Sequence, residues 1–189
     1  MIETTLCYIE NNGCYLMLHR IKKDGDVNAG KWIGIGGKLE PGETPDECIA
    51  RETAEETGLK ISSFTPRGVI YFYSDLWESE KMYLYSAKLP FTETSGCGDF
   101  TDEGAGGGSR SALPEYASPE CDLPEYTLPE CDEGVLKWIP FSEIPQLPLW
   151  EGDRIFLPNL MAGETDINLT RRYEGDKLIY SGETEDENI

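Results

Sequence analysis

Residues 44 to 58 carry the signals of one sharply bounded α-helix. Thr44 is a favourable N-cap, Pro45 suits the first helical position, and Glu47, three residues after the cap, completes a capping box. Gly58 supplies the C-terminal stop. Because both ends of this helix are defined, the segments before and after it must form other elements of the fold.

Segments rich in Tyr, Ile, Leu and Val lie on both sides of this helix, and that composition is typical of β-strands. We expect strands at 3–10, 14–20, 67–74, 80–89 and 135–141, a glycine-interrupted strand at 31–39, a second helix within 148–161 that begins near Leu149, and a closing hairpin at 167–181. Strands on both sides of a helix favour an α+β, or mixed α/β, layered fold. The 189 residues suit a single domain spanning 1–189.

One segment, at about 94–132, has a different composition and is rich in Gly, Ser, Pro and Glu. It contains "LPEYASPECD" followed by "LPEYTLPECD", two decapeptides that are identical at eight of ten positions. Proline at this density opposes helices and sheet interiors, which predicts an inserted low-complexity loop. The alternatives are a cloning scar or a Pro-Glu-Tyr ligand for a protein partner. Residues 182–189 are expected to form a frayed acidic tail.

The charge of the chain limits its partners. With 36 acidic and 16 basic residues the formal net charge is -20, so nucleic-acid polymers and anionic membranes would be repelled. The N-terminus lacks a secretory pattern, no apolar run approaches the length of a membrane span, and the six cysteines lack CxxC spacing. We therefore expect a cytoplasmic protein with reduced thiols. The single histidine, His19, is expected to complete a strand, which excludes a histidine-dependent triad.

Three glutamates, Glu52, Glu55 and Glu56, fall on one face of the predicted helix. Like charges at this spacing cost an isolated helix about 0.2–0.5 kcal/mol per pair unless a cation lies between them. Grouped carboxylates suit Mg²⁺, with Mn²⁺ as the alternative metal. A solvated surface face, with an ordinary ion pair between Glu47 and Arg51, is the competing interpretation.

A wider spacing favours the metal site. The chain fits the pattern G-x5-E-x7-R-E-U-x-E-E-x-G-U, where U is a bulky aliphatic residue, through Gly37, Glu43, Arg51, Glu52, Glu55, Glu56, Gly58 and Leu59. Thr53 stands at the first U position and is the one departure. The sequence therefore resembles the Nudix hydrolase family. The resemblance implies an αβα sandwich with a mixed β-sheet between helices, and hydrolysis of a nucleoside diphosphate linked to another group.

The resemblance also implies roles for the motif residues. Glu52 is expected to act as metal ligand and base, Glu56 as catalytic carboxylate and metal ligand, and Glu55 as metal ligand. Arg51 would hold these carboxylates in place. Backbone groups of Gly36 and Gly37 can approach the metal or the pyrophosphate closely, because neither residue has a side chain.

Outside the insertion, the chain resembles the MutT-type branch, which hydrolyses oxidised purine nucleoside triphosphates. The similarity lies in "AGKWIGIGGK", "ECDEGVLKWIPFSEIP" and "LWEGDRIFLP". It implies that Glu133 is a further catalytic or metal-binding carboxylate, and it implies a substrate site formed by Ile33, Lys38, Phe72, Trp150 and Asp153. Ile33 replaces an Asn that reads the purine in the best-known relatives. Trp150 could instead be a core residue, and Asp153 part of a turn.

These residues lead to one principal expectation and two alternatives. The expected activity is Mg²⁺-dependent hydrolysis of 8-oxo-dGTP, or of a related purine nucleoside triphosphate, to the monophosphate and pyrophosphate, as in nucleotide pool sanitisation and DNA repair. The first alternative is a Nudix hydrolase of ADP-ribose or a dinucleotide, which the replacement at Ile33 motivates. The second is a non-catalytic binding module whose Pro-Glu-Tyr repeats capture a protein.

Overall fold

The computed structural model describes residues 1–22, 25–89 and 128–184. Its elements, in chain order, are β1 (Ile2–Asn11), β2 (Cys14–Arg20), β3 (Trp32–Ile33), α1 (Pro45–Thr57), β4 (Thr65–Ser74), β5 (Glu80–Lys88), β6 (Gly134–Pro140), the 3₁₀ turn η1 (Ile144–Gln146), α2 (Asp153–Met161), β7 (Leu169–Glu174) and β8 (Lys177–Glu183). The strands expected at 3–10, 14–20, 67–74, 80–89 and 135–141 are confirmed, as is the closing hairpin.

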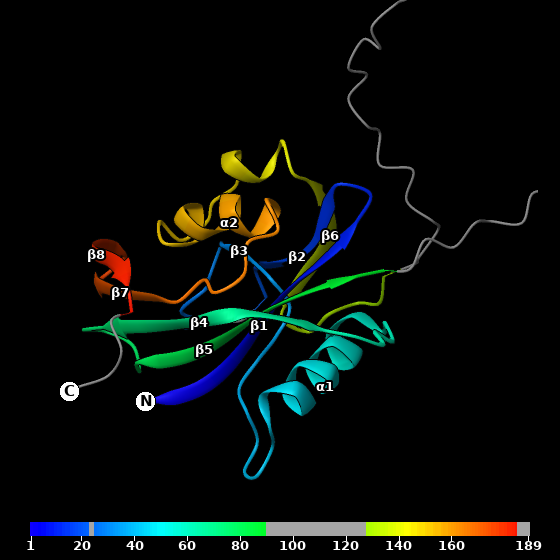
Figure 1. The fold of residues 1–189 in the computed structure, drawn as a ribbon, viewed down its shortest axis with the longest axis horizontal. Helices are drawn as coiled ribbons and strands as arrows, with labels where there is room; N and C mark the ends of the chain where they lie inside the picture. Colours follow the sequence, from blue (N-terminus) through cyan, green and yellow to red (C-terminus); the bar gives the residue numbers. More distant parts are fainter. Residues whose placement is uncertain (23–24, 90–127, 185–189) are drawn as a thin grey trace, which may run out of the picture.

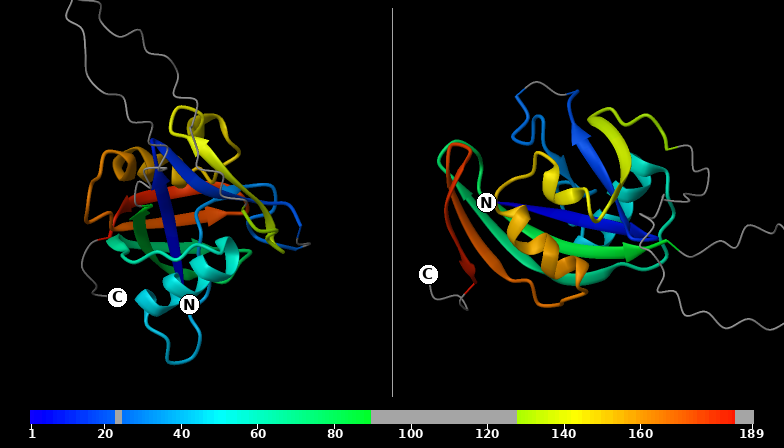
Figure 2. Two further views of the ribbon diagram at one scale, coloured as in Figure 1. Left: turned by 90° about the vertical axis from the view of Figure 1, so that its right-hand side faces the viewer. Right: turned by 90° about the horizontal axis from the view of Figure 1, so that it is seen from above.

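All the strands in the described ranges belong to one sheet with the order β3-β2-β1-β5-β4-β7-β8, and β6 pairs with β2. The pairs β1–β5 and β4–β7 are parallel, whereas β1–β2, β4–β5 and β7–β8 are antiparallel. The helices α1 and α2 cover opposite faces of this sheet (Figure 1), and the strands twist across the molecule (Figure 2). The expected layered fold with a mixed sheet between helices is therefore confirmed.

The central strand β1 is apolar on both faces because both faces are covered. Leu6 and Tyr8 join the cluster that contains α2 residues such as Phe156, whereas Cys7 and Ile9 join the cluster around Ile49 of α1. Successive side chains of a strand point to opposite faces, so one strand supplies both cores.

Helix α1 begins and ends where its caps predict. The Thr44 hydroxyl accepts a hydrogen bond from the Glu47 backbone, the Glu47 carboxylate accepts one from the Thr44 backbone, and Gly58 ends the helix with φ 68°. Thr53, the departure from the aliphatic pattern, is 1% exposed and packs toward the sheet. Because Thr53 is directed at the sheet, the glutamates of the motif lie on the sides of α1 that face the segment before the helix.

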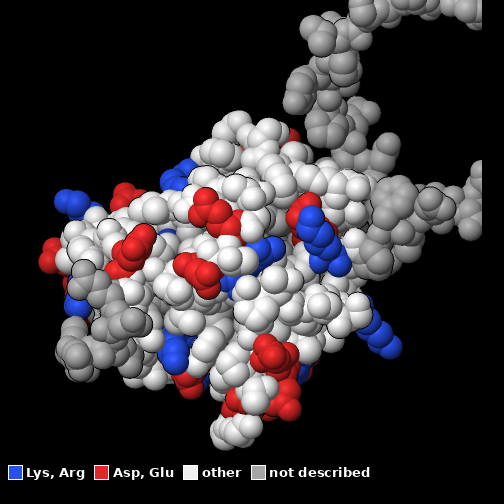
Figure 3. Space-filling model, viewed as in Figure 1, with Lys and Arg blue, Asp and Glu red and all other residues white. Residues whose placement is uncertain are grey.

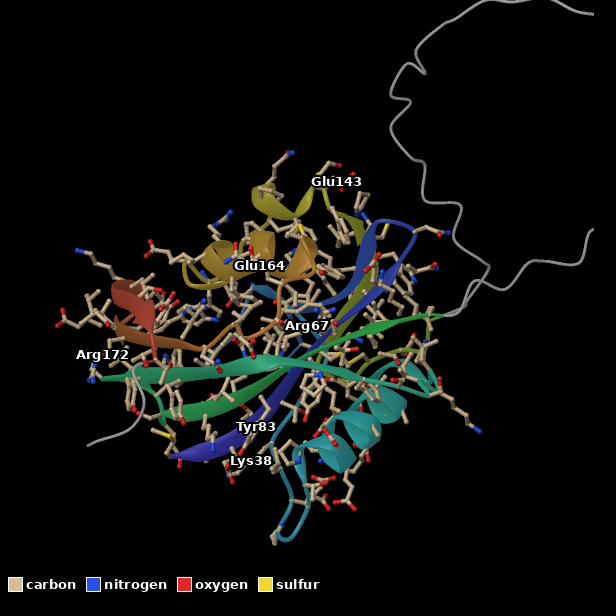
Figure 4. All side chains as sticks on the ribbon, viewed as in Figure 1. Lys38, Arg67, Tyr83, Glu143, Glu164 and Arg172 are labelled. Carbon is tan, nitrogen blue, oxygen red and sulfur yellow. The ribbon has the colours of Figure 1, made fainter. Side chains whose placement is uncertain are left out.

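The second helix begins later than expected. It starts at Asp153 and not near Leu149, because the backbone turns at Trp150 and Gly152. The Gly152 N–H donates to the Tyr173 hydroxyl at 2.9 Å, which fixes this turn against β7. The segment just after α2 is held against the sheet by Arg67 of β4, whose side chain donates to the carbonyls of Gly163 and Glu164 at 2.9 and 3.2 Å (Figure 4).

The segment 31–39 is a strand over only two residues. Trp32 and Ile33 pair with β2, and beyond them single bridges join Cys7 to Ile35 and Thr4 to Lys38. Gly36 has φ 150°, and a Cβ at this position would clash with the Thr5 carbonyl. The glycines thus let the chain run close to β1 without regular strand geometry.

Two expected boundaries and one expectation about thiols need correction. Most of the insertion predicted at about 94–132 lies outside the described residues, namely 94–127 with both Pro-Glu-Tyr tripeptides. Its last part is packed, since Cys131 is 6% exposed and Leu128 contacts the core. The predicted tail begins too early, because β8 extends through Glu183. Cys7, Cys48 and Cys131 are free thiols, whereas Cys14 is disulfide-bonded.

None of the helices in the described ranges is both long and apolar enough to cross a membrane.

Candidate active site

Arg51, on α1, donates hydrogen bonds to four different groups, three carboxylates and one backbone carbonyl. It donates through Nε and Nη2 to both carboxylate oxygens of Glu43, at 2.8 and 2.9 Å, and through Nη1 to Glu52 at 2.8 Å and Glu55 at 3.2 Å. Its Nη2 also donates to the Lys38 carbonyl at 3.3 Å. These hydrogen bonds lower the pKa of Glu43 to about 2. Arg51 therefore positions the motif carboxylates relative to the glycine segment.

Glu52 faces the glycine segment directly. Its carboxylate lies against Gly37, where an added Cβ would clash with it, so only glycine allows this approach. Burial raises the pKa of Glu52, and the nearby charges of Glu55 and Glu133 raise it further, while Arg51 opposes them. The Gly37 carbonyl is already used, since it accepts from the Thr5 N–H at 2.8 Å.

Glu56 is the most buried carboxylate of the motif, with 9% of the residue exposed. It accepts a hydrogen bond from the Gly36 N–H at 3.2 Å. Burial raises its pKa to about 8, and the charges of Glu133 and Glu52 act in the same direction. Glu55, in contrast, is an exposed residue whose side chain is 61% accessible. The three glutamates therefore share a helix but occupy three different environments.

Glu133 reaches the same region from the residue before β6. It forms an ion pair with Arg20 of β2, and Arg20 also pairs with Asp26 at 2.6 Å. An open cavity brings these groups together with the motif; its polar lining includes Glu52, Glu133, Arg20, Lys38, Gly36 and Gly37. Lys38 lies on the segment between β3 and α1 (Figure 4), and acidic side chains gather over α1 and that segment (Figure 3). The acidic end of the site is thus formed by side chains from α1, from the segment before α1, from β2 and from the residue before β6.

The chemistry of the donor set suits a hard divalent cation, although the carboxylates do not converge on one point. Within residues 1–22, 25–89 and 128–184, no three acidic, histidine or cysteine side chains are close enough to hold a metal ion. Arg51 and Arg20 instead pair with Glu52 and Glu133. Burial raises the pKa of Glu52 and of Glu56, and the charges of neighbouring carboxylates raise it further. A cation would relieve this repulsion, and carboxylate oxygens are the ligands that Mg²⁺ prefers.

A second cavity is mostly apolar and lies between the sheet and the start of α2. It contains four of the residues expected in the substrate site, Ile33, Phe72, Trp150 and Asp153. Trp150 is held by a hydrogen bond from its Nε1 to the Asn28 side chain at 2.8 Å. Its ring lies 6.1 Å from that of Phe72, measured between ring centres. Trp150 is therefore both packed and part of a cavity wall.

Asp153 places a carboxylate in this apolar cavity. Its side chain is 13% exposed and lies 3.4 Å from Nη1 of Arg171 on β7. Burial raises the pKa of Asp153 to about 6, against the opposing charge of Arg171. In its ionised form the carboxylate can accept hydrogen bonds from a ligand.

The two cavities adjoin each other. Both are lined by the same six residues, namely Leu6, Val27, Asn28, Ile33, Glu80 and Met82. The site therefore runs from the carboxylates of α1 to the aromatic cavity beside α2. Sequence reasoning did not identify Arg20, Asn28, Glu80, Arg171 and Tyr173 as members of this site. A signal existed for two of them, because Arg171 and Tyr173 occupy alternate, inward positions of β7.

Glu56 predicts a specific pH dependence of stability in the absence of divalent metal. Its folded pKa, about 8, lies above the ordinary value of 4.5, so folding favours the protonated form. The stabilisation is fully present below about pH 4.5 and is lost as the pH rises through 8. We expect the free energy of unfolding of wild type, relative to Glu56→Gln, to fall by about 2–2.5 kcal/mol between pH 5.5 and pH 7.5.

Chemical denaturation of both proteins in EDTA at several pH values measures this difference. Because glutamine cannot titrate, the variant removes only the contribution of Glu56. A wild-type curve that stays parallel to that of Glu56→Gln across this range would show that Glu56 has an ordinary pKa.

Comparison with known proteins gives a consistent result. The model of the NUDIX domain family matches residues 3–104, more than half of the chain. The nucleoside triphosphatase NudI of Enterobacter sp. (strain 638) is 42% identical over 67 residues, which cover 34% of this chain and 47% of that protein. The match thus spans about half the length of such curated relatives.

Solved structures match over more of the chain. A mutator MutT protein from Bacillus halodurans superposes with a TM-score of 0.67 at 19% identity, covering 96% of this chain and 97% of that chain. A MutT protein from Methanosarcina mazei Go1 gives a TM-score of 0.59 at 20% identity, covering 86% and 94%. At this level of identity the likeness concerns the fold alone.

Proposed function

This chain belongs to the NUDIX family, and we propose that it hydrolyses a purine nucleoside triphosphate to the monophosphate and pyrophosphate, with 8-oxo-dGTP as the leading substrate. The single observation that carries the proposal is the pair of adjoining cavities, of which one is lined by carboxylates and the other by aromatic rings with a carboxylate. A nucleotide has the same polarity, with a polyanion at one end and a flat base at the other.

The carboxylate end serves the phosphates only together with a divalent metal ion. Glu52, Glu56 and Glu133 would hold the ion, and Glu55 would assist from the surface. A bound Mg²⁺, or Mn²⁺, would lower the pKa of the attacking water and offset the charge on the phosphates. Lys38 lines the same cavity and would contact phosphate oxygens.

Proton transfer falls to Glu52. Its carboxylate lines the cavity, while Glu56 lies deeper and bonds to the Gly36 backbone. Burial has made Glu52 a stronger base than an exposed glutamate, which favours removal of a proton from water. The hydrogen bond from Arg51 at 2.8 Å fixes the Oε1 oxygen of Glu52.

The aromatic end serves the base. Trp150 and Phe72 offer ring faces and edges to a purine, and stacking of a base on an aromatic side chain contributes about 1–3 kcal/mol in single-stranded nucleic-acid sites. Asp153 would accept hydrogen bonds from the edge of the base. Ile33 contributes apolar contact without a hydrogen bond.

Parallel turnover assays on 8-oxo-dGTP, dGTP, ADP-ribose and a dinucleoside polyphosphate test this proposal. We expect Mg²⁺-dependent release of pyrophosphate, greatest with 8-oxo-dGTP, and loss of turnover in EDTA. A clear preference for ADP-ribose or the dinucleotide would replace the proposed substrate by the alternative that Ile33 motivates. Absence of turnover on every substrate would favour the binding module, whose Pro-Glu-Tyr repeats lie outside the described residues.

A further inference from the structure

Glu80 is a half-buried glutamate at the start of β5, and the hydrolysis proposed for this site gives it no role. It pairs with Phe72 of β4, so its side chain lies on the same face of the sheet as Phe72 and Met82. Six residues line both cavities, and within the described ranges Glu80 is the only charged one among them. It therefore marks the junction between the carboxylate end of the site and the aromatic cavity.

The carboxylate of Glu80 can accept more hydrogen bonds than it has. Its Oε2 accepts from the Thr4 hydroxyl at 3.2 Å, and no other hydrogen bond or ion pair reaches this side chain from the described parts of the chain. Burial raises the pKa of Glu80, the hydrogen bond from Thr4 opposes this, and the charge of Glu78 adds to it. A carboxylate has about four acceptor sites. A ligand in the adjoining cavities could therefore supply the missing donors.

The neighbours of Glu80 place it between the two ends of a bound nucleotide. Thr4, which holds the carboxylate, is 8% exposed, lines the same cavity as Glu52, and forms a single bridge with Lys38. Phe72, the strand partner of Glu80, lines the aromatic cavity. In a nucleotide the sugar joins the phosphates to the base. A ligand whose ends occupy the two cavities therefore has its sugar at their junction.

The chemistry of the junction favours a neutral donor. A carboxylate repels phosphate groups. The other five junction residues are four apolar side chains and Asn28, whose amide oxygen accepts from Nε1 of Trp150 at 2.8 Å. Sugar hydroxyls are neutral donors, and a carboxylate binds a ribose hydroxyl in dinucleotide-binding folds. We propose that Glu80 is a specificity-determining residue that accepts a hydrogen bond from the 3′-hydroxyl of the substrate sugar.

The ligand class is thus the nucleotides with a free 3′-hydroxyl, and this inference rests on the proposed function. dGTP and 2′,3′-dideoxy-GTP differ only in that hydroxyl. Glu80→Met removes the acceptor, whereas Glu80→Gln keeps the shape and a neutral acceptor. Glu78→Gln is the matched control, because it makes the same chemical change at an exposed position that lines neither cavity. The measured quantity is the ratio of kcat/KM for dGTP to kcat/KM for 2′,3′-dideoxy-GTP at saturating Mg²⁺.

We expect wild type to prefer dGTP by about 10- to 150-fold, the range for one hydrogen bond to a charged group. Glu80→Met should bring the ratio close to 1 by slowing dGTP, Glu80→Gln should give an intermediate ratio, and Glu78→Gln should keep the wild-type ratio. A wild-type ratio near 1, or a folded Glu80→Met protein with the wild-type ratio, would overturn the inference. An equal loss on both substrates would also overturn it, because Glu80 would then act on the metal ion or the fold.

Equilibrium binding separates this inference from the proposed activity. Binding of 2′-deoxyguanosine and 2′,3′-dideoxyguanosine, followed by tryptophan fluorescence in EDTA, involves no hydrolysis, metal ion or phosphate. Wild type should bind 2′-deoxyguanosine more tightly, and Glu80→Met should bind both nucleosides equally. If wild type hydrolyses no triphosphate but shows this preference, the proposed activity fails and the role of Glu80 stands. Equal affinity of wild type for the two nucleosides, or no binding of either, overturns the role of Glu80 even if the variants fail to fold.

Discussion

Glu52→Gln is expected to lower turnover by about 10²–10⁴-fold, the range for a positioned acid–base group, without unfolding the protein. Glutamine has the same shape and can still accept the hydrogen bond that Arg51 donates to Glu52 at 2.8 Å. It also fits against Gly37, where the space for a side chain is limited. The substitution therefore removes the negative charge and the basicity but keeps the packing. Steady-state kinetics with saturating Mg²⁺ measure the loss.

Glu47→Gln is the control for this prediction. It makes the same chemical change on the same helix, and glutamine is also accepted at the third position of a capping box, so both stability and turnover should stay close to wild type. Full activity of Glu52→Gln would remove Glu52 from the proton transfer. An equal loss in both variants would point to a general effect on α1.

Asp153→Ala is expected to destabilise the protein by about 3 kcal/mol or more at pH 7, because it leaves the buried Arg171 guanidinium without its carboxylate. For a chain of this size the melting temperature should fall by about 6–12 °C. Burial raises the pKa of Asp153, which indicates that the pair as a whole adds little net stability. The loss of Asp153 alone is still costly, because it leaves the charge of Arg171 buried without its partner.

The double variant Asp153→Ala/Arg171→Met should recover most of the lost stability, because it removes the unpaired charge and fills its volume with an apolar side chain. Asp153→Ala/Arg172→Met removes a surface arginine of the same strand and should recover nothing. Thermal and chemical denaturation of wild type, Asp153→Ala, Arg171→Met and Asp153→Ala/Arg171→Met form a double-mutant cycle, and Asp153→Ala/Arg172→Met is measured beside it as the control. A single-variant loss below about 1 kcal/mol, or equal recovery in both double variants, would show that Asp153 does not stabilise Arg171.

The helix of the motif could be predicted almost to the residue because its determinants are local. Thr44, Glu47 and Gly58 act through contacts within the helix and its caps, and these contacts do not depend on the rest of the chain. Apart from the glycine-interrupted segment 31–39, which is a strand only at Trp32 and Ile33, the strands were predicted to within a few residues for a similar reason. Their alternating or continuous apolar residues reflect burial on one or both faces of a sheet.

The start of α2 could not be predicted in this way. The sequence around Trp150 is compatible with a helix, but the indole is held by Asn28, which is 122 positions away, and the Gly152 backbone is held by Tyr173. Tertiary contacts therefore override the local preference and delay the helix until Asp153. The same contacts place Trp150 and Asp153 in one cavity wall.

The sequence by itself determined the family, the capped helix and the carboxylates that it carries, because a spaced motif on a single helix needs no knowledge of the sheet. Only the tertiary structure decided how these carboxylates differ, with Glu52 at the cavity, Glu56 buried and Glu55 exposed. It also decided which distant residues complete the site, such as Arg20 with Glu133 and Arg171 with Asp153. The physical reason is that strand order and register bring these groups together across long sequence distances, and burial then sets their pKa values and their need for partners.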